Sequence, residues 1–132
     1  MINCPVEIRF ADIDMAGHVH NAAYLHYFEA ARIQFFLSTL SQDWDWKKNG
    51  FILKKNTIEY VQPVYLTDKI SIDVNAIHIG TKSFTLSYRV LNSKKIIKTY
   101  GESVIVCFDF TSNQTVDIPS AIKELLAKHL DK

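Results

Sequence analysis

The sequence is poor in the features that mark disulfide-linked and membrane-spanning proteins. Cys4 and Cys107 are the only cysteines among 132 residues, and they lie too far apart to form a CxxC pair. Two cysteines in a chain of this size do not indicate a disulfide framework. No apolar run approaches the roughly 20 residues that a membrane helix needs. Because the first residues also lack a signal-peptide pattern, we expect a soluble cytoplasmic protein that does not enter a membrane.

A strong charge of one sign is also missing. Fifteen basic and fourteen acidic residues leave a formal net charge of +1. A nearly neutral chain does not predict a basic face, so nucleic acid is not an expected partner. A local basic patch for a phosphorylated ligand is compatible with this balance. Apolar residues make up 48% of the sequence, which is enough for the core of one domain spanning residues 1–132.

Hydrophobic periodicity predicts one long helix and several strands. Residues 3–10 are expected to form a strand, and residues 21–40 a helix that is apolar around most of its circumference. From Phe51 onward the apolar period changes to two, which is typical of half-buried strands. These strands are predicted at residues 51–62, 70–76, 84–90 and about 95–110. Pro119 then begins a short C-terminal helix.

This order predicts an α+β domain with one mainly antiparallel sheet. The long helix needs burial on most sides, which a curved sheet wrapped around it would supply. The last four strands are expected to form a meander. The run from Val104 to Phe108 is apolar on both faces, so it should lie centrally in the sheet or in a subunit contact, with Cys107 as a small core residue.

The loop between the first strand and the long helix contains most of the candidate chemistry. It contains two carboxylates, Asp12 and Asp14, and two imidazoles, His18 and His20, around Gly17. Unpaired N–H groups at a helix N-terminus can hold developing negative charge. A carboxylate beside such donors has the minimum equipment for attack on a carbonyl group.

The motifs of this loop and of the following helix resemble those of the hotdog-fold thioesterases, in particular the 4-hydroxybenzoyl-CoA thioesterase-like branch. The matching segments are RFADID at residues 9–14, GHV at 17–19, NAAY at 21–24 and EAAR at 29–32. Weaker matches are Tyr60 with Pro63, Asp68, and the GTKS turn at residues 80–83.

The resemblance implies a hotdog fold, in which a long central helix is wrapped by a mainly antiparallel five-stranded sheet. It implies a homodimer or homotetramer with active sites at the subunit boundary, and hydrolysis of acyl-CoA thioesters. By position, the catalytic aspartate falls on Asp14, and the backbone N–H that polarises the thioester carbonyl falls on Asn21. No metal or redox cofactor is implied, because CoA is part of the substrate. His20 departs from the family pattern, since many relatives have asparagine there.

Several residues also have a purely structural interpretation. Asp14 could be a turn aspartate or a cap of the following helix, and Asn21 could be only an N-cap. Asp12 is expected to bond N–H groups of the loop. His18 and His20 form an HxH pair that could bind a metal ion, but His26 is the only candidate for a third ligand, so metal binding is not expected. We expect His18 to fix the loop and to contact substrate.

The remaining candidates surround this loop or lie far downstream. Gly17 should allow a positive φ or a close approach by a ligand. Tyr24, with Tyr27, should be a core or subunit-contact aromatic, and Tyr24 is also a candidate for substrate binding. Lys82 and Ser83 could contact the pantetheine or phosphates of CoA, or simply begin a strand. Glu29 and Arg32, at i and i+3, predict a local ion pair.

The function predicted from these residues is acyl-CoA thioester hydrolysis, giving a free acid and CoA. Three alternatives remain open on the sequence. These are a thioesterase for acyl carrier protein, a non-catalytic acyl-CoA-binding protein, and a hydratase or dehydratase on the same fold. The sequence gives no reason to expect a serine or cysteine nucleophile, because it has no GxSxG motif and neither cysteine has a histidine close to it in the sequence. The acyl group cannot be read from the sequence.

Overall fold

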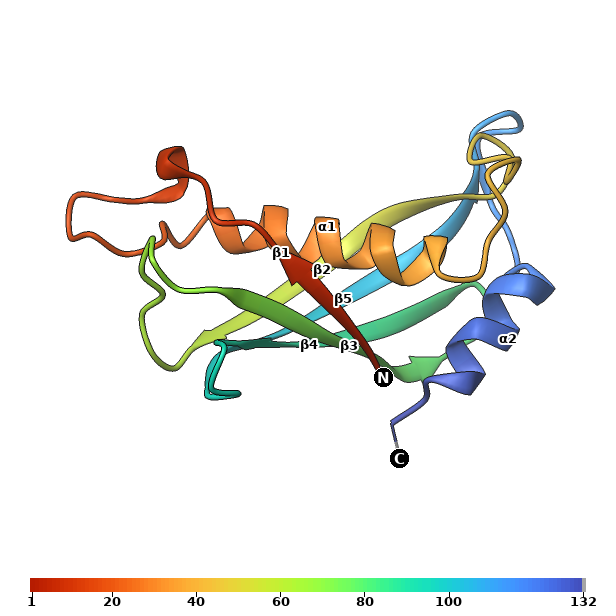
Figure 1. Cartoon of the computed structure of the whole chain (residues 1–132). Helices are drawn as coiled ribbons and strands as arrows, with labels where there is room; N and C mark the ends of the chain where they lie inside the picture. Colours follow the sequence, from red (N-terminus) through yellow and green to blue (C-terminus); the bar gives the residue numbers. More distant parts are fainter. Residues whose placement is uncertain (132) are drawn as a thin grey trace.

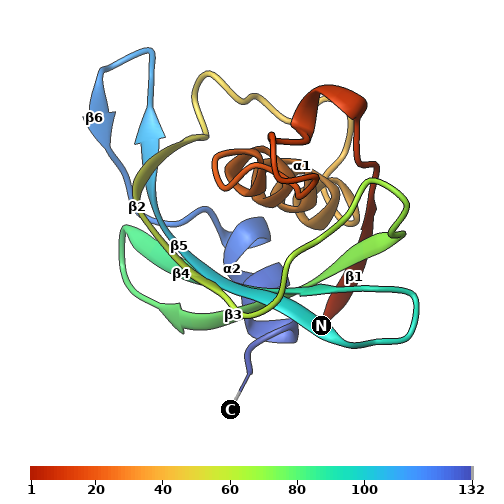
Figure 2. The same cartoon turned by 90° about the vertical axis from the view of Figure 1, so that its left-hand side faces the viewer.

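One long helix lies across the concave side of a curved antiparallel sheet in the computed structural model, which describes residues 1–131 (Figures 1 and 2). In chain order the elements are β1 (Ile2–Val6), the 3₁₀ helix η1 (Phe10–Asp12), α1 (Ala23–Leu37), β2 (Gly50–Tyr60), β3 (Ile70–Ile79), β4 (Ser83–Leu91), β5 (Ile97–Asp109), β6 (Gln114–Thr115) and α2 (Ser120–Lys128). This arrangement confirms the predicted α+β hotdog fold.

The sheet is ordered β1-β3-β4-β5-β2, and the short β6 pairs with β5. The strands β3, β4 and β5 form the predicted meander, but the prediction is wrong for β2. That strand pairs with β5, in a register that sets Tyr60 opposite Thr99. The connection of residues 61–69 therefore runs past the N-terminal end of α1 instead of making a tight hairpin (Figure 1). Its backbone bonds hold it on the loop before α1, where the Val19 N–H donates to the Val64 carbonyl at 2.7 Å.

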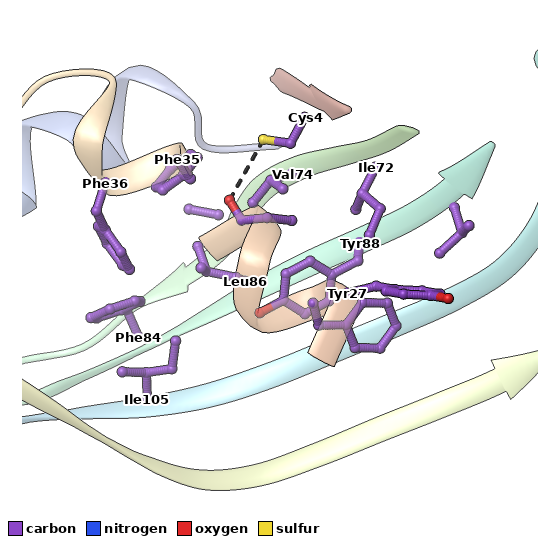
Figure 3. Close-up of a cluster of buried hydrophobic side chains, with 14 of the residues drawn as sticks. Cys4, Tyr27, Phe35, Phe36, Ile72, Val74, Phe84, Leu86, Tyr88 and Ile105 are labelled. Carbon is purple, nitrogen blue, oxygen red and sulfur yellow. Dashed lines mark hydrogen bonds between the residues drawn. The ribbon is translucent and has the colours of Figure 1, made fainter. Parts of the chain in front are cut away.

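The core lies between α1 and the inner face of the sheet (Figure 3). In β4 alternate residues from Phe84 to Val90 are buried, as the period of two predicts, whereas in β3 the whole run from Ile72 to Ala76 is buried, including Asp73 and Asn75. The Phe28 ring stacks on the Tyr88 ring, with centroids 4.4 Å apart. A Cβ atom at Gly101 would collide with the Phe28 ring, so this close approach depends on glycine. Cys4 and Cys107 are both buried, and burial raises the pKa of each thiol to about 11.

The helix α1 is shorter and more exposed than predicted. It covers Ala23–Leu37 instead of residues 21–40. Leu25, Ile33 and Leu37 remain 40–51% exposed, because the sheet covers only one side of α1 within a single chain. The prediction that this helix is buried on most sides is therefore wrong for the isolated chain.

The first strand is also shorter than predicted, since β1 ends at Val6 and the chain turns into η1. Within β5, the residues of the doubly apolar run alternate between buried Ile105 and Cys107 and partly exposed Val104, Val106 and Phe108. That run lies between β4 and β2, which confirms its interior position in the sheet. No helix within residues 1–131 is both long and apolar enough to cross a membrane.

Candidate active site

The loop before α1 closes on itself as a tight turn around Asp14. Ile13 and Val19 form an antiparallel bridge, and the Asp14 N–H donates to the His18 carbonyl at 2.8 Å. Gly17 has a φ of +82°, which confirms the predicted positive φ, and nothing lies within 4 Å of the position of a Cβ atom there. This left-handed conformation explains the glycine.

The Asp14 side chain is exposed and serves this turn through one of its two oxygens. Its Oδ1 accepts the Ala16 N–H at 2.9 Å and the His18 N–H at 3.1 Å. Asp14 therefore does not cap α1, whose N-cap is Ala22. Among residues 1–131, no donor bonds the other oxygen, Oδ2. The side chain thus combines a fixed position with one carboxylate oxygen that is available to a ligand.

The segment immediately before α1 presents a free backbone donor, the N–H of Asn21, which precedes the N-cap Ala22. The N–H groups of Ala22 and Ala23 bond His20, through Nδ1 at 3.0 Å and through the carbonyl at 2.9 Å. The Asn21 N–H, in contrast, has no acceptor within the described part of the chain. The alternative of Asn21 as the N-cap is wrong, because Ala22 occupies that position without a side-chain cap.

Asp14 and Asn21 line one open pocket of about 970 Å³. The pocket is lined by the loop before α1 and by the connection after β2. These two segments lie at the same end of the molecule (Figure 1). The predicted site residues His18 and Tyr24 also line it, and Gly17 lies within the turn that forms its rim. The full lining consists of residues 13–16, 18–21, 24 and 60–63.

Two tyrosine rings, those of Tyr24 and Tyr60, form part of the pocket lining. Tyr24 is 2% exposed, which confirms its assignment as a core aromatic, and its ring meets the Tyr60 ring edge-on at 5.1 Å. Burial raises the pKa of Tyr24. The Tyr60 hydroxyl donates to the Asn21 carbonyl at 2.9 Å. His18 packs its ring edge-on against Tyr65 at 5.1 Å, and its backbone bonds to Asp14 confirm its predicted role in fixing the loop.

Asp12 does not line this pocket, and both oxygens of its carboxylate accept hydrogen bonds. Its carboxylate accepts the Tyr27 hydroxyl at 2.7 Å, the Arg9 N–H at 3.0 Å and the Arg9 guanidinium at 3.1 Å. Burial acts to raise the pKa of Asp12, but the bonds from Arg9 and Tyr27 outweigh it and hold the pKa below its ordinary value. These contacts confirm the predicted structural role.

Two further predictions, for Lys82 with Ser83 and for the pair of Glu29 and Arg32, concern residues outside this pocket. Ser83 is the first residue of β4, Lys82 precedes it, and neither residue lines the pocket. Ser83 pairs with Val106, near the opposite end of β5 from Thr99. Lys82 forms an exposed ion pair with Asp117 at 3.1 Å. The predicted pair of Glu29 and Arg32 is wrong, since it is not among the ion pairs of residues 1–131.

Arg32 is directed into the space between α1 and the sheet. Its guanidinium donates to the Tyr88 hydroxyl at 3.2 Å and to the Ser103 hydroxyl at 3.3 Å. The Ser103 hydroxyl in turn donates to the Asn56 side-chain oxygen. These contacts join α1 to three strands and explain why Arg32 does not reach back to Glu29.

The two histidines of the HxH pair have separate contacts in the structure. His20 Nδ1 is taken by the Ala22 N–H, and the His18 ring packs on Tyr65. Within residues 1–131, no three histidine, cysteine, aspartate or glutamate side chains come together in a group that could hold a metal ion.

The sequence that forms this site and this fold matches a known protein family. The sequence profile of the thioesterase-like superfamily matches residues 8–126, which is most of the chain. The chain is a member of the thioesterase-like superfamily. The matched range includes the whole pocket, from Ile13 to Pro63.

Several relatives are similar to this thioesterase-like protein over most of their length. The acyl-CoA thioester hydrolase YbgC of Escherichia coli O6:H1 is 25% identical over 124 residues, covering 89% of this chain and 90% of YbgC. The uncharacterized protein YsmA of Bacillus subtilis strain 168 is 31% identical over 123 residues, covering 92% and 82% of the two chains. A thioesterase from Thermus thermophilus, crystallised with coenzyme A and Zn, is 28% identical with a TM-score of 0.81, covering 96% of this chain and 91% of that chain.

Several pocket residues were not assigned to the site from the sequence. Among them, Tyr60 lines the pocket from the end of β2, and Gln62 from the connection that follows. The family match at Tyr60 and Pro63 was the available sequence signal. It located the end of a strand, but it did not indicate that this strand end lies beside the loop before α1. His20, noted only as a departure from that pattern, bonds the start of α1 through its ring.

Proposed function

We propose that this protein hydrolyses an acyl-CoA thioester to a free acid and CoA. The observation that supports this function is the shared pocket of Asp14 and Asn21, in which a free carboxylate oxygen faces the same space as a free N–H at a helix start. Its membership of the thioesterase-like superfamily points to the same chemistry. The thioester carbonyl oxygen would bind the Asn21 N–H, where the partial positive charge of the helix stabilises an oxyanion.

Asp14 would then act in one of two ways. Its Oδ2 could attack the carbonyl carbon, expel the CoA thiolate and form a mixed anhydride that water hydrolyses. Alternatively, Asp14 could take a proton from a water molecule as that water attacks, and then give the same proton to the departing CoA thiolate, which restores the carboxylate. Both routes need the carboxylate charge and a free oxygen.

The first experiment is a thiol-release screen across acyl-CoA substrates of different chain length and aromaticity. We expect release of free CoA from at least one class, measured with a thiol reagent and with product analysis by mass spectrometry. A free acid product distinguishes hydrolysis from addition to, or formation of, a double bond. Binding of acyl-CoA with no product from any class would contradict the proposed hydrolysis.

The second experiment is the substitution Asp14→Asn. The amide keeps an oxygen that can accept the Ala16 and His18 N–H groups, so the turn should be retained while the charge and the reactive oxygen are lost. We expect thiol release to fall by at least ~100-fold, the low end for loss of a general base. Affinity for a non-hydrolysable acyl-CoA analogue and the melting temperature should change little.

Asp109→Asn is the matched control. Asp109 is the last residue of β5, lies outside the pocket, and also accepts two N–H groups of a turn through Oδ1. This variant should keep its turnover. Near-normal turnover in Asp14→Asn would refute the catalytic role and leave Asp14 as a turn residue only.

The position of Lys82 and Ser83 bears on assembly. Since they lie away from the pocket of their own chain, we propose that any contact they make with substrate occurs at the pocket of a second copy. A dimer or tetramer with active sites at the subunit boundary would provide this arrangement. The exposed apolar residues Leu25, Ile33 and Leu37 of α1 support such an assembly.

A further inference from the structure

The peptide group between Asn21 and Ala22 is held at both ends by side chains. Its carbonyl accepts the Tyr60 hydroxyl at 2.9 Å, and its N–H donates to His20 Nδ1 at 3.0 Å. The two side chains come from different parts of the fold, since Tyr60 ends β2 and His20 precedes α1. A peptide plane bonded at both ends has little freedom to rotate.

The preceding peptide group, between His20 and Asn21, is held at one end only. The His20 carbonyl accepts the Ala23 N–H at 2.9 Å, while the Asn21 N–H has no acceptor within residues 1–131. The free N–H is therefore the one open position in a pair of otherwise bonded peptide groups. Because Asn21 is the residue joining these two groups, fixing both fixes the direction of its N–H.

We propose that Tyr60 is a positioning residue, which with His20 holds the Asn21 N–H in the direction that a substrate oxyanion needs. This inference rests on the proposed thioester hydrolysis, and in it Tyr60 affects the reaction through the N–H of Asn21. An oxyanion donor contributes most when it is oriented before the reaction and need not reorganise during it. Tyr60 supplies that orientation from the sheet, which is more rigid than the loop.

The surroundings of Tyr60 suit this role. Its ring packs against the buried Tyr24, and the chain just after it is fixed because the Val61 and Gln62 N–H groups both donate to the Lys98 carbonyl at 3.0 Å. Partial burial raises the pKa of Tyr60, so the hydroxyl remains a protonated donor. The Asn21 carbonyl has no other donor among residues 1–131, since the Leu25 N–H bonds the Ala22 carbonyl at 3.3 Å.

The test is Tyr60→Phe, which keeps the ring and removes only the hydroxyl. We expect kcat for thiol release to fall about 5–10-fold, in line with one neutral hydrogen bond, while KM stays within about 2-fold and the melting temperature is unchanged. Tyr100→Phe is the control, because Tyr100 is a similarly exposed tyrosine on β5 that does not line this pocket. An unchanged kcat, or a rise in KM with kcat unaltered, would overturn the proposal.

A second measurement separates this proposal from the proposed function. Amide hydrogen exchange at Ala22 should become about 5-fold faster in Tyr60→Phe, because its peptide group loses one of two anchors, while amides of β3 and β4 keep their rates. If the wild-type protein releases no thiol from any acyl-CoA, the proposed function fails and this exchange result alone decides on the anchor. Unchanged exchange at Ala22, or faster exchange throughout the core, would refute it.

Discussion

Asp12 and Asp14 are two residues apart in one loop, yet their surroundings are opposite. Asp12 is 5% exposed and accepts three hydrogen bonds, from Arg9 and from Tyr27. Asp14 is exposed and accepts two, both through one oxygen. The difference arises because η1 turns Asp12 toward α1, whereas the turn around Gly17 directs Asp14 to the pocket.

The comparison shows how a fold assigns different tasks to identical side chains. A carboxylate whose oxygens are both occupied stabilises the structure and has little capacity left for chemistry. One with an unoccupied oxygen can do chemistry while its other oxygen keeps it in place. Sequence spacing cannot make this distinction, since each aspartate precedes an apolar residue in the same loop.

The largest expected effect on stability comes from Asp12→Asn. The side-chain NH₂ group of asparagine replaces one of two carboxylate oxygens that accept hydrogen bonds from Arg9 and Tyr27. Because NH₂ is itself a donor, at least one of these bonds is lost, and the negative charge is removed as well. We expect a loss of about 1.5–3 kcal/mol in the free energy of unfolding at pH 7, from the typical contribution of hydrogen bonds to charged groups. Urea unfolding measures it, and turnover per folded molecule should stay within about 3-fold. A stable variant with turnover as low as that of Asp14→Asn would reverse the two roles.

A smaller effect is expected from Tyr27→Phe. This change removes the 2.7 Å bond to Asp12 but leaves both bonds from Arg9. The free energy of unfolding should fall by about 1 kcal/mol. The same urea titration measures it, and the double variant with Asp12→Asn should lose less than the sum of the two single changes. Additive losses would mean that the two side chains do not act through their shared bond.

The smallest effect is a dependence of stability on pH. Since the pKa of Asp12 in the folded protein is below its ordinary value of 3.8, its stabilisation is complete above that value and is lost as the pH falls through the lower, folded pKa. The stability difference between wild type and Asp12→Asn should therefore be constant near neutral pH and shrink below about pH 3.8. Urea unfolding at several pH values tests this, and a difference that stays constant into strong acid would contradict it.

Local patterns predicted much of this structure. Alternation in residues 70–76 and 84–90 identified β3 and β4, and the apolar segment after Asn21 identified α1. The family motif identified the loop of Asp14 and the start of α1, and the structure places both in one pocket. These signals are short in range, because each depends on residues within about one element.

Some incorrect predictions concern only the ends of β1 and α1, but those with the largest consequences involve partners far away in the sequence. Spacing along α1 paired Arg32 with Glu29, but its hydroxyl partners lie 56 and 71 residues away. The position of β2 beside β5 depends in the same way on the whole sheet. Tyr60 could not be assigned to the pocket for this reason, because nothing near it in the sequence indicates that its hydroxyl meets Asn21.

The pairing of β2 with β5 has a consequence for how the pocket comes into existence. Tyr60 is aligned by Thr99, far downstream in the sequence, and the wall after it is bonded to Lys98. Contacts of such long sequence separation are slow to form, because closing the intervening chain costs entropy. During synthesis, the two sides of the site can therefore meet only after β5 has emerged, so the pocket depends on residues far downstream of Asp14 and Asn21.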